Sequence, residues 1–194
     1  FIFSVKISTC EITWSGCQIG KSKMNFRMVP ASESGIKENP GITYAGAWGY
    51  FNCDGYPDIW LNNHVARPVS FYMNNGDGTF KDVTAEIFVG KPNADHHGSA
   101  FADFDNDGDQ DLMSMVGAGA GRSVNPFTTH GRLFVNEGGK LEDRATAHNI
   151  GYPLNRGRGL LWLDFNRNGL LDLIPGVAAR LVPPEIPSIV FNQK

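Results

Sequence analysis

The sequence predicts an all-β protein built of repeated units, each with about four short antiparallel strands. Three observations support this. Glycine contributes 23 of the 194 residues and charged residues only 19%, which is typical of a turn-rich chain with a packed core. No long stretch has the apolar periodicity of an amphipathic helix, and Gly and Pro interrupt the chain frequently. One acidic segment also recurs three times, and such a repeat indicates a modular fold.

The recurring segment has one pattern in all its copies. The copies start at Ala45, Gly98 and Gly159 and read AGAWGYFNCDGYPDIWL, GSAFADFDNDGDQDLMS and GLLWLDFNRNGLLDLIP. Each contains a nine-residue loop, and we name these loop 1 (50–58), loop 2 (103–111) and loop 3 (164–172). Every loop has Phe at position 2, Gly at position 6 and Asp at position 9. An aromatic residue stands two residues before each loop: Trp48, Phe101 and Trp162.

A second segment with hairpin signals follows the first two loops. SFYMNNGDGTFKDVTAE from Ser70 parallels RLFVNEGGKLEDRATAH from Arg132, and NNGDG and NEGG are turn sequences between apolar alternations. The third copy starts as SIVFNQ from Ser188, and NFRMVPASESGI from Asn25 resembles the closing part of an earlier copy. The loops begin 53 and 61 residues apart, room for about four strands and their turns, as in a β-propeller blade.

The domain organisation follows from these repeats. We expect residues 25–194 to form about three blades, a partial propeller, and residues 1–24 to be an N-terminal extension of unclear role. Propellers typically have about 4–8 blades, and an open stack exposes strand edges and apolar faces. We therefore expect further blades from a longer chain or from a second subunit.

The acidic loops have the spacing of a calcium site. Oxygen ligands at alternating positions, with Gly at the bend, surround a hard cation that takes about 6–8 oxygens. In loop 2 the expected ligands are Asp103, Asp105, Asp107, the carbonyl of Asp109, and Asp111. An EF-hand opens in the same way but needs Glu at position 12 and flanking helices, whereas Ser114 stands there and the flanks read as strands. A solvated acidic turn is the other alternative, and the threefold recurrence disfavours it.

The three loops offer unequal ligand sets. Loop 3 supplies fewer carboxylates, and Arg167 adds a positive charge: its expected ligands are Asp164, Asn166, Asn168, the carbonyl of Leu170, and Asp172. Loop 1 has Tyr50 at position 1, which leaves Asn52, Asp54, the carbonyl of Tyr56, and Asp58. Because ligand charge tunes calcium affinity, we predict the order loop 2, loop 3, loop 1, with a purely structural turn as an equal alternative for loop 1.

These residues resemble the FG-GAP, or VCBS, repeats of integrin-α-type β-propellers, whose blades contain D-x-D-x-D-G-x-x-D loops. NNGDGTFKDVT followed by HHGSAFADFDNDGDQDL is similar to the propellers of bacterial secreted repeat proteins and of the cartilage acidic protein family. The resemblance covers about residues 25–194 and is most specific in loop 2. It implies calcium-stabilised blades in an extracellular or periplasmic protein that serves adhesion, ligand binding or scaffolding, with a protein or carbohydrate ligand. Loops of this kind would fill at the millimolar calcium found outside cells.

Other functional classes have less support. A net charge of −3 does not indicate a nucleic-acid binder, and the absence of an 18-residue apolar run argues against a membrane span. No nucleophile motif or separate carboxylate pair marks an enzyme. Three cysteines, Cys10, Cys17 and Cys53, do not make a disulfide framework. Adjacent His96 and His97 point apart on a strand, so a hydrogen-bonding role is favoured over a shared metal.

Two alternative functions remain open at the level of sequence. A carbohydrate-binding or polysaccharide-degrading propeller would use exposed aromatic side chains, for which the candidates are Trp48, Trp60 and Trp162. Their positions beside the loops instead suggest packing between blades. The other alternative is an accessory subunit of a larger assembly, whose partners would cover the open edges.

Overall fold

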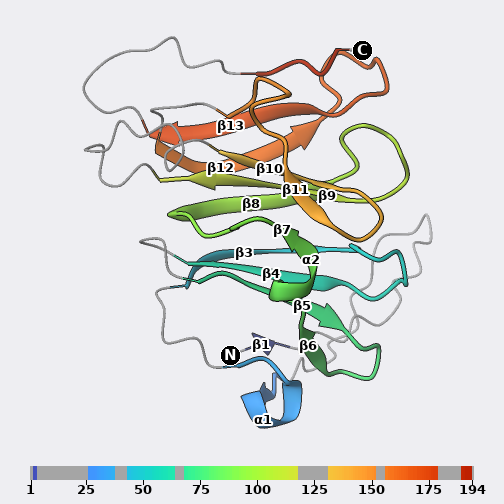
Figure 1. The fold of residues 1–194 in the computed structure, drawn as a ribbon, viewed down its shortest axis with the longest axis vertical. Coiled ribbons are helices and arrows are strands. Elements are labelled where there is room, and N and C mark those ends of the chain that lie inside the picture. The colour runs from blue at the N-terminus through green and yellow to red at the C-terminus, as the bar shows by residue number, and fades with distance from the viewer. Residues whose placement is uncertain are drawn as a thin grey trace, which may run out of the picture.

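The computed structural model describes residues 2–3, 26–37, 43–63, 68–117, 131–151, 156–178 and 189–193. Its strands form a stack of separate sheets, with β2 and α1 at one end of the molecule and β12 and β13 at the other (Figure 1). The elements up to the first four-stranded sheet are β1 (Ile2–Phe3), β2 (Met28–Val29), α1 (Ala31–Ser34), β3 (Thr43–Gly49), β4 (Asp58–Asn63), β5 (Ser70–Asn74) and β6 (Phe80–Asp82). The remaining elements are α2 (Thr84–Ile87), β7 (Phe88–Val89), β8 (His96–Ala102), β9 (Asp111–Val116), β10 (Arg132–Asn136), β11 (Leu141–Asp143), β12 (Arg156–Leu163) and β13 (Asp172–Ala178).

Three blades follow one another along the chain. Blade 1 is the antiparallel sheet β3-β4-β5-β6, and blade 2 has the same order in β8, β9, β10 and β11. Blade 3 contains β12 and β13, and Val190 extends it through an antiparallel bridge to Leu173. The structure thus confirms an all-β partial propeller, with sheets that do not close into a ring among the described residues.

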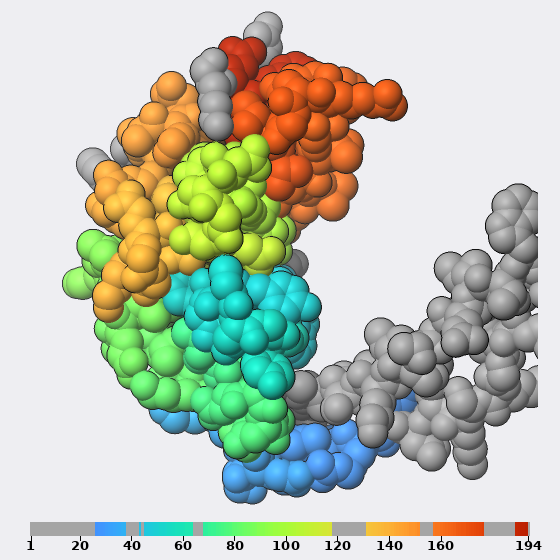
Figure 2. Space-filling view, turned by 90° about the vertical axis from the view of Figure 1, so that its right-hand side faces the viewer, coloured from blue at the N-terminus to red at the C-terminus, as the bar shows by residue number. Residues whose placement is uncertain are grey.

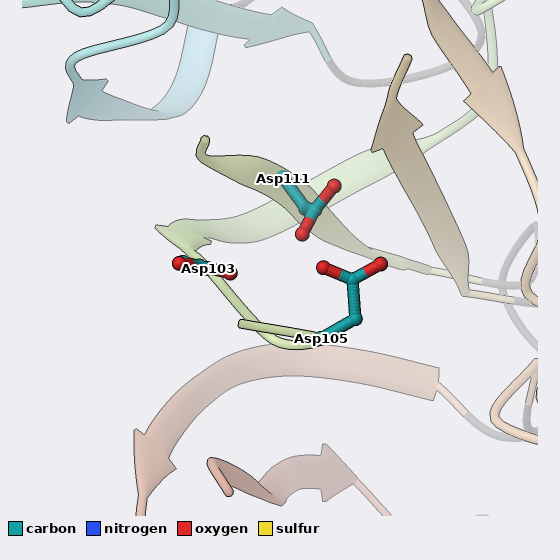
Figure 3. A group of neighbouring side chains, drawn as sticks. All are labelled: Asp103, Asp105 and Asp111. Atoms are coloured by element: carbon teal, nitrogen blue, oxygen red, sulfur yellow. The ribbon is translucent and has the colours of Figure 1, made fainter. Parts of the chain in front are cut away.

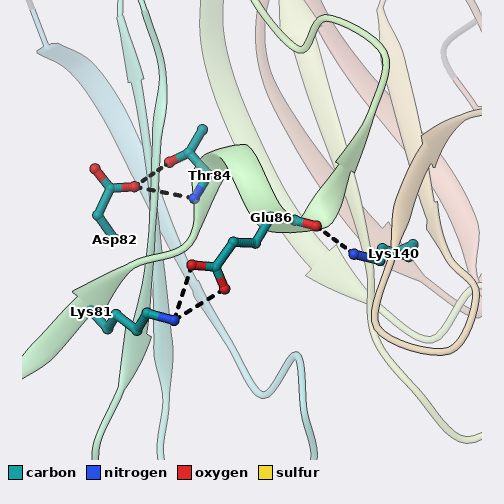
Figure 4. Close-up of polar contacts among 5 residues, drawn as sticks. All are labelled: Lys81, Asp82, Thr84, Glu86 and Lys140. Carbon is teal, nitrogen blue, oxygen red and sulfur yellow. Dashed lines mark hydrogen bonds and ion pairs between the residues drawn. The ribbon is translucent and has the colours of Figure 1, made fainter.

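The link between blades 1 and 2 is fixed by a short helical turn after the last strand of blade 1 (Figure 4). The Asp82 carboxylate accepts hydrogen bonds from the backbone N–H and the hydroxyl of Thr84, at 3.1 and 2.7 Å, and α2 begins there. Lys81 pairs with the Glu86 side chain, while Lys140 of blade 2 donates to the Glu86 carbonyl at 2.5 Å. Strand β7 then pairs in parallel with β11, so the end of blade 1 forms the outer edge of the blade 2 sheet.

The hydrophobic cores lie between blades. One cluster joins blade 1 to blade 2: its buried members include Phe51, Trp60, Phe71, Leu112, Phe134 and Leu141. A second joins blade 2 to blade 3: it includes Phe104, Met113, Leu133, Val135 and Leu173, with Trp162 and Val190 packed against it. Aromatic rings in the first cluster pack edge to face, as in the Phe51–Phe71 pair, whose ring centroids are 5.1 Å apart. Adjacent blades therefore bury the faces that they turn toward one another, as expected of a repeat protein.

Residues before β3 continue this pattern. Strand β2 and helix α1 precede blade 1 as β6 and α2 precede blade 2, and Ile36 packs on Ile59 and Tyr72 of blade 1. Ile2 and Phe3 pair with β2. Residues 4–25, with Cys10 and Cys17, lie outside the described part of the chain.

The blades follow a curve that is open on one side (Figure 2). The first strands of the blades, β3, β8 and β12, lie next to one another along it. Each acidic loop joins the first strand of a blade to its second strand, because loop 1 follows β3, loop 2 follows β8 and loop 3 follows β12. This topology brings the loops to the same end of the sheets.

Candidate metal centre

The three loops share an unusual backbone. The glycine at position 6 has a positive φ in every copy, from 84° to 101°, which an L residue rarely adopts: Gly55, Gly108 and Gly169. Position 4 also has a positive φ, near 60°, although no copy has glycine there: Cys53, Asn106 and Arg167. Two left-handed residues within three positions fold the chain back on itself. The backbone N–H of position 2 therefore reaches the aspartate at position 9, the first residue of the next strand.

The aspartate at position 9 holds each loop to its own blade. In loop 2 one Asp111 oxygen accepts the Phe104 backbone N–H at 3.3 Å and the other accepts the Asn136 N–H at 2.8 Å. The equivalent bonds recur in loop 1 and loop 3: Asp58 joins Phe51 and Asn74, and Asp172 joins Phe165 and Asn192, at 2.8–3.0 Å. These three carboxylates are all at most 2% exposed. Position 9 is thus a structural carboxylate in every copy, whatever else it binds.

Loop 2 brings three carboxylates together (Figure 3). One oxygen each from Asp103, Asp105 and Asp111 lie within 4.8 Å of one another, and Asp105 turns its carboxylate toward Asp111. Asp103 also accepts the backbone N–H groups of Asp107 and Gly108, both at 3.1 Å, which fixes its orientation. The group forms an anionic cluster at the start of β9, whose first residue is Asp111.

Two oxygens of this loop are buried with no hydrogen-bond partner. They belong to the carboxylates of Asp105 and Asp109. A buried carboxylate oxygen without a donor is costly, since the charge loses water and gains nothing in return. These oxygens therefore fit a bound cation, and the donor set consists of oxygens alone, which a hard cation prefers.

The raised pKa values of the loop 2 carboxylates also favour a bound cation. Burial, followed by repulsion from Asp107 and Asp105, raises the pKa of Asp109 to about 6. Burial also raises the pKa of Asp111 to about 7, against the opposing effect of its two backbone hydrogen bonds. The pKa of Asp105 is raised by burial and by Asp107. Without a counter-charge the loop is strained electrostatically, and a cation would relieve it.

Loop 3 has the same scaffold with less charge. Asp164 accepts N–H groups from Asn168 and Gly169, at 3.0 and 2.9 Å, as Asp103 does in loop 2. The side-chain oxygens of Asn166 and Asn168 accept bonds from the backbone of the same loop, from Asn168 and from Leu170. The loop offers oxygen donors in the expected places, but its amides have partners already.

Loop 1 is closed by contacts among its own candidate ligands. Asn52 donates from its side-chain amide to the Asp54 carboxylate at 2.8 Å, and Asp54 also accepts the Tyr56 N–H at 2.8 Å. Tyr50 at position 1 cannot supply the carboxylate that Asp103 supplies in loop 2. Asp58, whose pKa is raised by burial, is occupied by its two backbone donors.

Contacts between neighbouring loops were not predicted from the sequence. The side-chain amide of Asn136 in blade 2 donates to the Phe51 carbonyl of loop 1, and Asn192 donates in the same way to the Phe104 carbonyl of loop 2. The hairpin Asn that follows each loop in the repeat is the signal that could have identified these links. Gln110 of loop 2 makes a further contact with loop 1, because its side-chain oxygen accepts a hydrogen bond from the Tyr50 N–H at 2.7 Å.

The remaining candidates have structural roles. His96 is fully buried, contacts the Ser114 hydroxyl and the Pro92 carbonyl, and burial lowers its pKa to about 4. His97 is buried beside Asp95 and Arg158. The two rings use different partners, in line with a hydrogen-bonding role. Trp60 is fully buried, whereas Trp48 is 56% exposed.

Fold and loops together define an all-β propeller-type repeat protein with acidic loops at one end of its blades. No helix among the described residues is long and apolar enough to span a membrane. Residues 50–114, which include loops 1 and 2, match the sequence profile of the FG-GAP-like repeat. The chain thus contains a repeat of the FG-GAP-like family, in agreement with the resemblance seen in its loops.

A similar protein in humans supports this family. The chain is 36% identical over 103 residues to cartilage acidic protein 1 of Homo sapiens. The aligned part is 53% of this chain but only 15% of that protein. The likeness therefore covers only part of each protein and does not transfer the properties of the whole relative.

Proposed function

We propose that loop 2 binds one calcium ion and that the ion stabilises the propeller. The proposal rests on the two buried carboxylate oxygens without partners, in Asp105 and Asp109, beside the three converging carboxylates. The ion would be held by Asp103, Asp105 and Asp111, with Asp107 and Asp109 completing the shell. Asp109 would bind through its carbonyl or through the buried side-chain oxygen. When bound, calcium supplies the positive charge that the loop lacks.

Loops 3 and 1 would be weaker sites in that order. Loop 3 keeps the position-1 carboxylate and its backbone donors, so Asp164, Asn166, Asn168, the Leu170 carbonyl and Asp172 can still offer oxygens. In loop 1 a cation would have to break the Asn52–Asp54 bond and would find Tyr50 at position 1. Asn52, Asp54, the Tyr56 carbonyl and Asp58 therefore form the poorest set.

At the level of the whole domain, we propose a non-enzymatic binding or scaffold module outside the cytoplasm. The FG-GAP-like match and the human relative support a repeat domain of extracellular proteins, and calcium sites with dissociation constants of about 10⁻⁴–10⁻³ M fill in that setting. The ligand would be a protein or a carbohydrate, in adhesion or in scaffolding. A role for Trp60 in sugar stacking is disfavoured, because its ring is inside the core.

Thermal unfolding in calcium and in excess chelator tests the metal proposal. Calcium at about 100 times its dissociation constant stabilises the folded state by about 2.7 kcal/mol, which raises the melting temperature by about 5–11 °C in a domain of this size. The Asp105→Ala variant should lose most of this difference, since it removes a central ligand. The matched control Asn52→Ala, in the poorest loop, should keep it. An equal melting temperature in calcium and chelator, or a full calcium response in Asp105→Ala, would refute the proposal.

A further inference from the structure

Two asparagines of this chain are followed directly by glycine, the sequence in which an asparagine side chain is most open to attack by the backbone. They are Asn75, in the hairpin between β5 and β6, and Asn168, at position 5 of loop 3, and both are exposed. In this reaction the glycine nitrogen bonds to the side-chain carbon, ammonia leaves, and water opens the ring that results. Glycine favours the attack because it has no Cβ to shield its nitrogen. The two sites differ in the groups that surround the reacting atoms.

At Asn168 a carboxylate contacts the attacking group. The Gly169 backbone N–H donates to one oxygen of Asp164 at 2.9 Å, and the other oxygen accepts the Asn168 N–H at 3.0 Å, so the carboxylate is fixed in this position. A carboxylate in hydrogen-bond contact with an N–H can act as a general base and take its proton as the nitrogen attacks. The backbone here is also open, since a Cβ built on Gly169 would meet no heavy atom of the described residues within 4 Å beyond its chain neighbours.

The side-chain amide of Asn168 is held at both ends. Its Oδ1 accepts the Leu170 backbone N–H at 2.9 Å, and its Nδ2 donates to the Asn192 carbonyl at 3.4 Å. The negative charge that develops on Oδ1 during the attack would face the Leu170 N–H, which acts as a single oxyanion donor. Holding the amide next to its attacking group also lowers the entropic cost of the reaction.

At Asn75 a different group contacts the attacking nitrogen. The Gly76 N–H donates to the side-chain oxygen of Asn74 at 2.9 Å, and a neutral amide is a much weaker base than a carboxylate. Tyr56 crowds this glycine, because a Cβ built on Gly76 would lie 2.8–3.1 Å from atoms of the tyrosine ring. The amide nitrogen of Asn75 donates to the Thr79 hydroxyl at 2.9 Å. Asn75 is therefore a matched reference site within the same chain.

We propose that Asn168 is a deamidation site, at which the folded chain converts an amide of loop 3 into a carboxylate without an enzyme. The Gly169 nitrogen forms a bond to Cγ of Asn168 while Asp164 takes its proton. The bond between Cγ and Nδ2 then breaks, and Nδ2 leaves as ammonia with that proton. Water next opens the five-membered ring. Opening at Cγ restores the normal backbone and gives aspartate, whereas opening at the backbone carbonyl gives isoaspartate, in which the chain runs through the side chain.

The other loops show that aspartate fits at this position. Loops 1 and 2 have Asp54 and Asp107 at position 5, and both residues are exposed although another blade packs beside each loop. In loop 2 the Gly108 N–H donates to Asp103 and the Asp109 N–H donates to Asp107, which are the same bonds as in loop 3. Conversion to aspartate would give loop 3 carboxylates at positions 1, 5 and 9, as in loop 2. The charge of loop 3 would then become more negative as the molecule ages.

Peptide mapping by mass spectrometry tests this inference on the full chain. The folded chain is incubated in chelator at mildly alkaline pH, and the replacement of amide by carboxyl is followed separately at Asn168 and Asn75. Since a positioned general base contributes about 10²–10⁴-fold, we expect Asn168 to convert at least about tenfold faster than Asn75. In denaturant the two rates should become similar, because both sites are then plain Asn-Gly sequences. Similar rates in the folded chain, or a preference for Asn168 that persists in denaturant, would overturn the inference.

The variant Asp164→Asn tests the general base. It keeps the size of the side chain and removes its charge, so conversion at Asn168 should slow about tenfold while conversion at Asn75 is unchanged. The control Glu137→Gln, which removes a charge from the hairpin of blade 2, should leave both rates as they are. Circular dichroism checks that each variant is folded, and an unchanged rate at Asn168 in folded Asp164→Asn overturns the inference.

The rates measured in chelator do not depend on the calcium proposal, whereas the effect of conversion on cation binding rests on it. The variant Asn168→Asp has the aspartate product from the start. It should show a larger difference in melting temperature between calcium and chelator than the unmodified chain, because added ligand charge raises calcium affinity. An unchanged difference would overturn the effect on cation binding, and the conversion rates test the deamidation site separately.

Discussion

Two kinds of carboxylate occur in the loops, and they differ in what holds them. Asp58 is fully buried, and each of its oxygens accepts a backbone N–H, from Phe51 and from Asn74. Asp105 has a buried oxygen with no donor at all. The first carboxylate has both oxygens hydrogen-bonded within its own blade, whereas the second has an oxygen that the proposed cation would satisfy.

The substitutions Asp58→Asn and Asp105→Asn should separate these roles. In Asp58→Asn an amide group faces a backbone donor, so the free energy of unfolding should fall by about 1–3 kcal/mol in both calcium and chelator. Asp105→Asn should lower stability in calcium only, and in chelator it should be neutral or stabilising because a repelled charge is gone. Denaturant unfolding in the two conditions measures both. Equal behaviour of the variants would show that the loops contain one kind of carboxylate.

The spacing of acidic residues within a loop predicts which side chains lie close together, but it does not predict the hydrogen-bond partner of each oxygen. The alternating acidic residues of loop 2 include Asp103, Asp105 and Asp111, whose carboxylates lie together in the structure. The double acceptor role of position 9 depends on the Asn residue of the following hairpin, which is 25 residues away for the Asp111–Asn136 pair. A linear motif does not contain that partner. The inward side chain of Asp109 was also missed, because its position suggested a carbonyl ligand.

At the scale of an element, loop 2 should respond to pH. The pKa values of Asp109 and Asp111, at about 6 and about 7, lie above the usual value of 3.8. The folded calcium-free chain therefore binds protons more tightly than the unfolded chain. The stability that this gives is present at low pH and is lost as pH rises through these values. Bound calcium requires the ionised carboxylates, so protons compete with it.

The melting-temperature difference between calcium and chelator should consequently shrink as pH falls from about 8 to about 5.5. His96 has the opposite dependence, since its pKa is lowered to about 4 and the stability it contributes is lost below its usual value of 6.5. The contribution of His96 to stability should be the same with and without calcium, so it cancels in the melting-temperature difference between the two conditions. Scanning calorimetry at several pH values measures the effect. A difference that is constant over this range would contradict the role assigned to these carboxylates.

At the scale of the whole molecule, the blades should unfold together. The core between blades 1 and 2 includes Leu141 of blade 2, which is fully buried, and Trp60 of blade 1. Leu141→Ala should cost about 2–5 kcal/mol and should also speed amide hydrogen exchange in β4 of blade 1. The control Val89→Ala, at an exposed residue, should change stability by less than about 0.5 kcal/mol. Unchanged protection in β4 would mean that the blades are independent.

Much of the architecture was predictable because it repeats. The loop positions and the hairpin sequences indicated four-strand units, and blades 1 and 2 have them. The parallel pairing of β7 with β11 was not predictable, since Phe88 and Val89 have no sequence signal that assigns them to the next sheet. The burial of the loop phenylalanines between adjacent blades was also not predictable. That depends on how adjacent units stack, and three similar sequences leave Phe51 and Phe104 buried but Phe165 exposed.

The bonds from position 4 of one loop to position 6 of the next have a thermodynamic consequence. The Asn106 side chain donates to the Gly169 carbonyl, and the Cys53 thiol lies near the Gly108 carbonyl. Loop 2 is therefore tied to loop 1 on one side and to loop 3 on the other. A cation that orders one loop changes the cost of ordering its neighbour, and the effect is equal in both directions by linkage. A cation bound at loop 2 would then change the affinity of loop 3 for a second cation, and a cation at loop 3 would change that of loop 2 by the same factor.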